Sequence, residues 1–136
     1  MRVFLDANIL FSAAKSAGAV RELLRLLLDN RHECWVDDYV VIEAHRNLAA
    51  KAPDALVAFE ALLKRLRISP AQAPGPELKL VNWLPEKDRT VLAAAIRLRC
   101  DALVTGDRTH FGPGYGKIFA GVTIHSPRSL AERLFG

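Results

Sequence analysis

Four short apolar runs along the chain are predicted to be buried strands. They are three to five residues long and are rich in aliphatic and aromatic side chains. Continuous apolar runs of this length are typical of strands that are covered on both faces, as in a parallel sheet. The runs are residues 2–6, 33–36, 102–105 and 122–124, and the first is predicted to lead into a loop.

Between these runs, apolar residues recur at helical spacing and predict amphipathic helices. The clearest stripe is made by the leucines of residues 18–30. Asp37 or Asp38 is placed to cap the next helix, and Pro53 suits the first turn of the helix after it. The predicted helices cover residues 18–30, 38–52, 53–66, 89–99 and 127–135.

Strands that alternate with helices indicate an α/β fold with a central, mainly parallel sheet. The connecting segments 70–76 and 110–121 are rich in Pro or Gly and are predicted to be loops, whereas residues 78–81 are predicted to be extended. A parallel sheet of this kind binds ligands at the carboxyl ends of its strands. Candidate functional residues are therefore sought at that edge.

The composition predicts one soluble domain. The chain has 136 residues, of which 51% are hydrophobic and 25% charged, enough for a single core. No apolar run is long enough to cross a membrane. Asp6 and Asn8 interrupt the apolar N-terminus, which argues against a signal peptide and favours a cytoplasmic protein. Cys34 and Cys100 form no CxxC pair and are interpreted as free, buried thiols in a reducing compartment.

The charge balance is mildly basic. Nineteen Lys and Arg residues stand against 15 Asp and Glu, giving a formal net charge of +4 and a sequence pI near 9.4. This balance permits a nucleic-acid partner without requiring one. Despite the basic surplus, several acids occupy apolar contexts or the ends of predicted elements, and these acids are the candidate chemistry.

Four acids have positions that are individually ordinary. Asp6 and Asp107 follow predicted strands, where Asp commonly begins a turn. Asp88 stands at a helix start, where Asp commonly caps the helix, and Glu43 lies on a polar helix face. The two strand ends and the helix start can nevertheless converge at one sheet edge. Converging carboxylates repel one another and lose hydration, so such a cluster requires cations.

The donor type of this cluster predicts both the cation and the reaction. Carboxylate oxygens without neighbouring His or Cys ligands in the sequence suit Mg²⁺ or Mn²⁺ and argue against zinc. Hydrolysis of phosphodiesters is the chemistry most often built on such a site, because bound metal ions lower the pKa of water and stabilise the leaving oxygen. The residues therefore predict a metal-dependent phosphodiesterase.

Four segments resemble, in order and approximate spacing, the acidic signatures of PIN domains. They are residues 3–10 (VFLDANIL), 41–44 (VIEA), 86–95 (EKDRTVLAAA) and 103–108 (LVTGDR). No single motif is specific, but the ordered set is, and it spans essentially the whole chain. PIN domains are metal-dependent nucleases, so the resemblance implies a Rossmann-like, three-layer α/β/α sandwich formed by residues 1–136 as a single domain.

The resemblance also implies roles for individual residues. Asn8 and Thr105 match polar positions that orient the acids or a metal-bound water. Small bacterial and archaeal PIN domains are frequently VapC-like toxins that cleave RNA, which implies an RNA substrate, a small antitoxin partner and a homodimer. Housekeeping RNA processing is the alternative to a toxin. The catalytic, metal-binding positions fall on Asp6, Glu43, Asp88 and Asp107.

Several basic residues near these acids in sequence are candidates for phosphate contact. Such contacts position a nucleic acid without reading its sequence, although any one of these side chains could equally be solvated surface. The long segment after Asp107 leaves open whether His110, Tyr115 or Lys117 contacts the substrate. The basic candidates are Arg46, Lys87, Arg89, Arg108 and Lys117.

Two other functions fit parts of the pattern. A phosphatase of the haloacid dehalogenase type requires a second Asp two residues after its nucleophile, but Asn8 follows Asp6 at that spacing and cannot transfer a proton. A PIN-like module that binds RNA or a protein without cleavage would share the fold. The presence of all four acids favours the nuclease over both alternatives.

Overall fold

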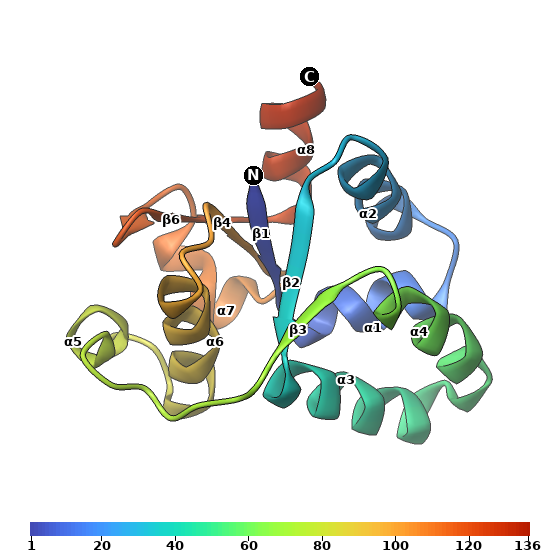
Figure 1. The fold of residues 1–136 in the computed structure, drawn as a ribbon, viewed down its shortest axis with the longest axis horizontal. Helices are drawn as coiled ribbons and strands as arrows, with labels where there is room; N and C mark the ends of the chain where they lie inside the picture. Colours follow the sequence, from blue (N-terminus) through green and yellow to red (C-terminus); the bar gives the residue numbers. More distant parts are fainter.

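The computed structural model describes residues 1–136 and contains a six-stranded sheet with the strand order β3-β2-β1-β4-β6-β5 (Figure 1). All neighbouring strands are parallel except β5, which pairs antiparallel with β6. The predicted α/β fold with a mainly parallel sheet is confirmed. The strands are β1 Arg2–Leu5, β2 Glu33–Asp37, β3 Arg67–Ser69, β4 Ala102–Val104, β5 Ile118–Phe119 and β6 Val122–His125.

Helices lie on both sides of this sheet. In Figure 1, α1 to α4 gather on one side of the strands, and α5, α6 and α7 lie on the other. The helices are α1 Ala7–Lys15, α2 Ala19–Asp29, α3 Asp38–Lys51, α4 Leu56–Leu63, α5 Leu78–Val81, α6 Glu86–Arg97, α7 Arg108–Phe111 and α8 Pro127–Phe135. Two short 3₁₀ helices, Pro53–Ala55 and Gly112–Gly114, complete the chain.

The core is organised around β1, which lies between β2 and β4. Val3, Phe4 and Leu5 have no exposed surface. Val3 lies opposite Cys34 of β2 on one side and Ala102 of β4 on the other. A central strand that is covered on both faces explains why the apolar run shows no alternation. The carboxyl ends of β1 and β4 consequently lie next to each other.

Both cysteines are buried and free, as the sequence predicted. Burial raises the pKa of Cys34 and of Cys100 to about 12. Because the thiolate is the reactive form of cysteine, neither side chain is a nucleophile at neutral pH.

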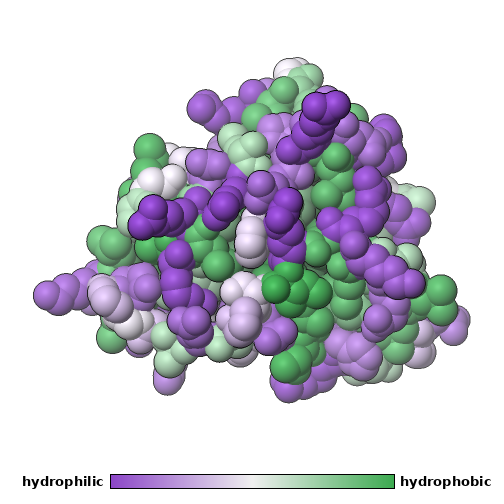
Figure 2. All heavy atoms as spheres, in the orientation of Figure 1, coloured by the Kyte–Doolittle hydropathy of each residue, from purple (hydrophilic) through white to green (hydrophobic).

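Hydrophilic side chains cover most of the face seen in Figure 2, with smaller hydrophobic areas between them. The large hydrophobic side chains that are exposed include Ile42 of α3, Val57 of α4 and Ile118 of β5. None of the helices combines the length and the apolar character that a membrane span requires.

The segment after Asp6 differs from the prediction of a loop, which is wrong. Residues Ala7–Lys15 form α1, and the Asp6 carboxylate caps this helix by accepting the backbone N–H of Ala7. The helix buries Ile9 and Ala13, one turn apart, against the core. Burial of this face, together with the cap, stabilises a helix directly after the strand.

Three other segments also differ from the prediction. Residues 78–81 form α5 instead of an extended segment, and only Val81 among them is buried. The predicted loop 110–121 contains the end of α7, a 3₁₀ turn and β5. Ala120 and Gly121 have φ angles of 49° and 87°, which suit the tight turn between β5 and β6. Strand β3 was not predicted, because its three residues at the sheet edge include no fully buried side chain.

Candidate active site

The four predicted acids line one cavity at the carboxyl edge of the sheet. This cavity has a volume of about 240 Å³. Two of the acids follow the central strands β1 and β4, one lies on α3, and one lies in the first turn of α6. The structure thus brings together Asp6, Glu43, Asp88 and Asp107.

Asp6 is the most firmly held of these acids, and the residue is only 5% exposed. Its Oδ1 accepts the backbone N–H of Ala7 at 2.7 Å. Its Oδ2 accepts the hydroxyl of Thr105 at 2.8 Å and the amide of Asn8 at 3.2 Å. Both carboxylate oxygens are therefore fixed by hydrogen bonds within the protein.

Asn8 and Thr105 extend this network to the end of β4. The side-chain oxygen of Asn8 accepts the backbone N–H of Gly106 at 2.8 Å, and the hydroxyl of Thr105 accepts the backbone N–H of Asp107 at 3.1 Å. The same two side chains thus contact Asp6 and the segment that carries Asp107. These are the contacts that the orienting role expected of Asn8 and Thr105 requires.

Burial raises the pKa of Asp6 to about 6. The hydrogen bonds from Thr105 and Ala7 oppose this shift, whereas the charges of Asp88 and Glu43 add to it. A buried carboxylate that faces other carboxylates is stabilised by a proton or by a metal cation. At neutral pH the site therefore favours the binding of positive charge.

Glu43 projects from α3 and forms an ion pair with Lys87 of α6. Its hydrogen bond and its charge raise the pKa of the Lys87 ammonium. Asn47 and Lys51 lie one and two turns further along α3 and line the same cavity. These two residues are not among the candidates from the sequence, although their spacing of four places them on the face of Glu43.

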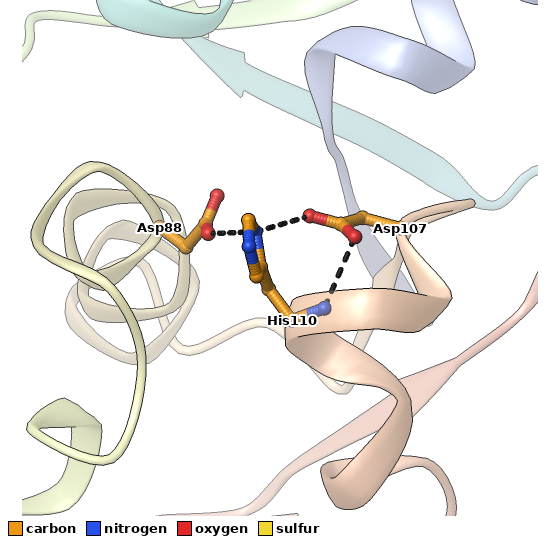
Figure 3. A group of neighbouring side chains, drawn as sticks. All are labelled: Asp88, Asp107 and His110. Atoms are coloured by element: carbon orange, nitrogen blue, oxygen red, sulfur yellow. Dashed lines mark hydrogen bonds and ion pairs between the residues drawn. The ribbon is translucent and has the colours of Figure 1, made fainter.

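His110 lies between Asp88 and Asp107 (Figure 3). Its Nδ1 is 2.9 Å from Oδ2 of Asp88 and 3.0 Å from Oδ2 of Asp107. The backbone N–H of His110 donates to Oδ1 of Asp107 at 3.1 Å, which makes Asp107 the cap of α7. The imidazole is 46% exposed. A single, half-exposed side chain therefore joins these two acids.

Asp88 does not cap α6. The helix begins at Glu86, after Pro85, so Asp88 lies in the first turn with its side chain directed at the cavity. Burial raises the pKa of Asp88; the neighbouring His110 opposes this shift and Asp107 adds to it. The expectation of an ordinary helix cap is wrong, because Pro85 occupies the capping position.

Two of the predicted basic residues lie at or beside the acidic cavity. Lys87 lines it, and Arg108 lines a neighbouring cavity. Arg89 instead donates its guanidinium to the carbonyl of Leu84, which ties the start of α6 to the segment before it.

Arg46 and Lys117 lie away from the acids. Arg46 lines a separate depression next to Glu60, on a different face of α3 from Glu43. Lys117 is exposed in the turn before β5 and is not among the residues that line the acidic cavity.

The donor set of the cavity fits a divalent cation. Asp88, Asp107 and His110 each offer one ligand atom, and these atoms lie within 4.8 Å of one another. Carboxylate oxygens of this kind suit Mg²⁺ and Mn²⁺. His110 adds an imidazole nitrogen, which corrects the expectation of a site without a neighbouring histidine.

The fold and the site together define an α/β protein with an acidic cavity at the carboxyl edge of its sheet. The family model of the PIN domain matches residues 2–109, and the chain therefore belongs to the PIN-domain family. A search of curated proteins finds no match.

Solved structures confirm the PIN-like fold. The chain is similar to VapBC2 from Rickettsia felis bound to a promoter DNA fragment, with a TM-score of 0.67 and 17% identity over 93% of this chain and 98% of that chain. FitAcB from Neisseria gonorrhoeae has a TM-score of 0.66 and 18% identity over 93% of this chain and 98% of that chain. VapC20 from Mycobacterium tuberculosis, a Sarcin-Ricin loop cleaving toxin, has a TM-score of 0.61 and 15% identity over 85% of this chain and 98% of that chain.

Proposed function

We propose that this protein is a divalent-metal-dependent endoribonuclease and the toxin of a toxin–antitoxin pair. The observation that carries the proposal is the convergence of four acids from separate elements in one cavity. Membership of the PIN-domain family supports the nuclease activity. Similarity in fold to VapC20, described as a Sarcin-Ricin loop cleaving toxin, supports RNA as the substrate.

The residues of the cavity divide the work of such a reaction. The acids would hold Mg²⁺ or Mn²⁺, and the bound ion would lower the pKa of water and stabilise the leaving oxygen. Asn8 and Thr105 keep Asp6 in one orientation through their hydrogen bonds. Lys51 and Lys87 also line the cavity and bring positive charge to which a phosphate can approach.

Cleavage by purified protein tests the nuclease activity. With Mn²⁺ or Mg²⁺ and a labelled single-stranded RNA we expect internal fragments, and with excess EDTA we expect intact RNA. Asp6→Asn, purified in parallel, controls for contaminating nuclease. Equal cleavage by wild type and Asp6→Asn, or undiminished cleavage in EDTA, would contradict the proposal. Binding of RNA without any cleavage would support a non-catalytic module instead.

The toxin role is tested in cells. The structures similar in fold include VapBC2 and FitAcB, which supports a small antitoxin as the partner of this chain. Expression of the protein alone is expected to arrest growth, and Asp6→Asn is expected to relieve the arrest. Normal growth with abundant, folded wild-type protein would contradict the toxin role. Light scattering of the purified protein tests the homodimer that we also propose.

A further inference from the structure

A second cavity, of about 560 Å³, lies beside the acidic one and differs from it in chemistry. Its walls come from α2, from the segment after β4, and from the start of α8. They include Leu23, Arg108, Tyr115, Arg128 and Ala131, and no acid lines this cavity. Its volume is within the range of about 300–1,000 Å³ that is typical of small-ligand sites.

The two cavities are joined along the carboxyl edge of the sheet. A hollow of about 400 Å³ shares Asn8 and Asp107 with the acidic cavity, and Gly106 and Pro127 with the second cavity. The backbone N–H of Gly106 is held by Asn8, which fixes the wall between the two cavities. Three hollows with shared lining residues therefore follow one another from the acids to Arg108.

The second cavity carries positive charge that the protein does not neutralise. Arg108 takes part in none of the ion pairs of the structure. Arg128 pairs with Glu132 at 3.0 Å, but its side chain is 89% exposed, so this pair is weak and easily exchanged. Two guanidinium groups in a cavity without acids favour an anionic ligand.

Tyr115 gives the same cavity a fixed aromatic wall. Its hydroxyl donates to the carbonyl of Thr105 at 2.8 Å, which holds the ring at the end of β4. Burial raises the pKa of this tyrosine, and the charge of Arg108 partly opposes the shift because the guanidinium lies nearby. Aromatic rings together with arginines are the features on which nucleic-acid bases stack and their phosphates bind.

We infer that the second cavity binds one nucleotide of a single-stranded RNA. The phosphodiester linkage next to this nucleotide would lie at the acids. The base of the nucleotide would lie against Tyr115 and its phosphate would bind Arg108. The inference rests on the proposed function for the substrate class. A nucleotide explains the combination of cations, apolar walls and continuity with the acidic cavity, whereas an apolar peptide would leave the two arginines without partners.

Binding measured without catalysis tests this site. We would follow the fluorescence anisotropy of a fluorescein-labelled, ten-nucleotide single-stranded RNA in EDTA, over a series of salt concentrations. Arg108→Ala is expected to weaken binding about tenfold and to lower the slope of log K against log salt by about 1, as for the loss of one phosphate contact. Arg133→Ala, an exposed arginine on α8 outside the cavity, is expected to change the affinity less than about twofold.

A second variant fills the cavity instead of removing charge. Ala131→Phe is expected to weaken RNA binding about fivefold or more, because its ring occupies the space of a stacked base. Ala58→Phe, in the groove between α2 and α4, is the matched control and should leave the affinity unchanged. Thermal melts identify any variant that does not fold, in which case Arg108→Ala decides.

The outcomes separate this inference from the proposed function. If Arg108→Ala binds RNA as tightly as wild type, the inference is overturned even when wild type cleaves RNA. If wild type binds more tightly than Arg108→Ala and Ala131→Phe but never cleaves, the nucleotide site is supported and the proposed ribonuclease is refuted.

Discussion

The acidic cavity has two halves that are built differently. Around Asp6, hydrogen bonds from the backbone and from two side chains fix both carboxylate oxygens, and Thr105 is completely buried. Between Asp88 and Asp107, one imidazole makes the connection, and almost half of its surface is exposed. The first half is a rigid, buried network, whereas the second depends on a side chain that solvent reaches.

This difference indicates how the site combines order with access. Groups that are fixed before the substrate arrives need no reorganisation during the reaction. Groups held by an exposed side chain can exchange that partner for a metal ion at small cost. We therefore expect Asp6 to define the geometry of the site, and Asp88 with Asp107 to adjust to what binds there.

The largest expected effect distinguishes the two halves of the cavity by whether added Mn²⁺ restores the activity of a variant. Asp6→Asn should lower kcat for RNA cleavage by about 10³-fold or more, which corresponds to about 4 kcal/mol in the barrier. An increase of about twentyfold in the Mn²⁺ concentration should not restore activity, because the variant has lost a ligand that is fixed in place. Asp107→Asn should lose activity as well but regain about tenfold at high Mn²⁺. Equal rescue of both variants in steady-state kinetics would remove the proposed difference.

The second effect is a pH dependence of metal-free stability. The pKa of Asp6 is about 6 in the folded protein against an ordinary value of 3.8, so the folded state binds this proton more tightly. Its contribution is complete below pH 3.8 and is lost as the pH rises through 6. The free energy of unfolding should fall by about 3 kcal/mol over this range.

Denaturant titrations in EDTA between pH 4 and 7.5 measure this dependence. Asp6→Asn should make it shallower, because Asp6 no longer titrates, while Asp88, whose pKa burial also raises, still contributes. Added Mn²⁺ should stabilise wild type most above pH 6, where the Asp6 carboxylate is ionised and available to the cation. A wild-type profile no steeper than that of Asp6→Asn would show that burial does not raise the pKa of Asp6 in the folded protein.

A smaller effect is expected from Thr105→Val, which keeps the shape of the side chain. The hydroxyl donates to the buried Oδ2 of Asp6 and accepts the backbone N–H of Asp107. Its loss leaves Oδ2 with only the longer bond from Asn8, and leaves the N–H of Asp107 without this partner. We expect a loss of about 2 kcal/mol in the free energy of unfolding. Thr123→Val in β6 is a matched control with an expected change below about 0.5 kcal/mol. Similar losses for the two variants would contradict a structural role of the Thr105 hydroxyl.

The smallest effect concerns the exposed half. His110→Ala removes the side chain that joins Asp88 and Asp107, and should destabilise the metal-free protein by less than about 1 kcal/mol, because the imidazole is 46% exposed and solvent-exposed charged contacts contribute little. The rise in melting temperature on adding Mn²⁺ should become larger, since the ion no longer displaces a partner. A smaller rise would instead identify His110 as a ligand of the ion.

The strands and the convergence of acids could be predicted because both depend on simple patterns. Continuous apolar runs mark β1 and β4 as buried, and neighbouring parallel strands end at the same edge. Asp6 and Asp107 follow from that placement alone. The confirmed free thiols of Cys34 and Cys100 likewise follow from spacing and burial.

Helix α1 could not be recognised by reading one element at a time. Asp6 ends a strand and caps a helix at once, so the chain changes periodicity without any turn residues between. The apolar positions Ile9, Leu10 and Ala13 have helical spacing, but they follow an apolar strand and extend its run. Asp6 as a helix cap is the informative signal, but an Asp after a strand is equally typical of a turn.

The place of His110 between Asp88 and Asp107 could not be predicted for a different reason. Helix α7 has four residues, too few to show any periodicity, and glycines follow it directly. Once Asp107 is known to cap this helix, the i+3 position becomes the natural neighbour of its carboxylate. The placement of His110 thus depends on whether residues 108–111 form a helix, and the tertiary structure decides this.

The contacts of Asn8 also determine when the acidic cavity is completed during synthesis of the chain. The hydrogen bonds that join Asp6 and Asn8 to Thr105 and Gly106 connect residues 97 to 99 positions apart. A chain synthesised from its N-terminus therefore presents Asp6 and Glu43 long before their partners exist. Closing so long a loop is costly in chain entropy and is repaid only when β4 pairs with β1. An unfinished chain on the ribosome thus lacks half of the acidic cluster, so under the proposed function it has no complete site with which to cleave RNA.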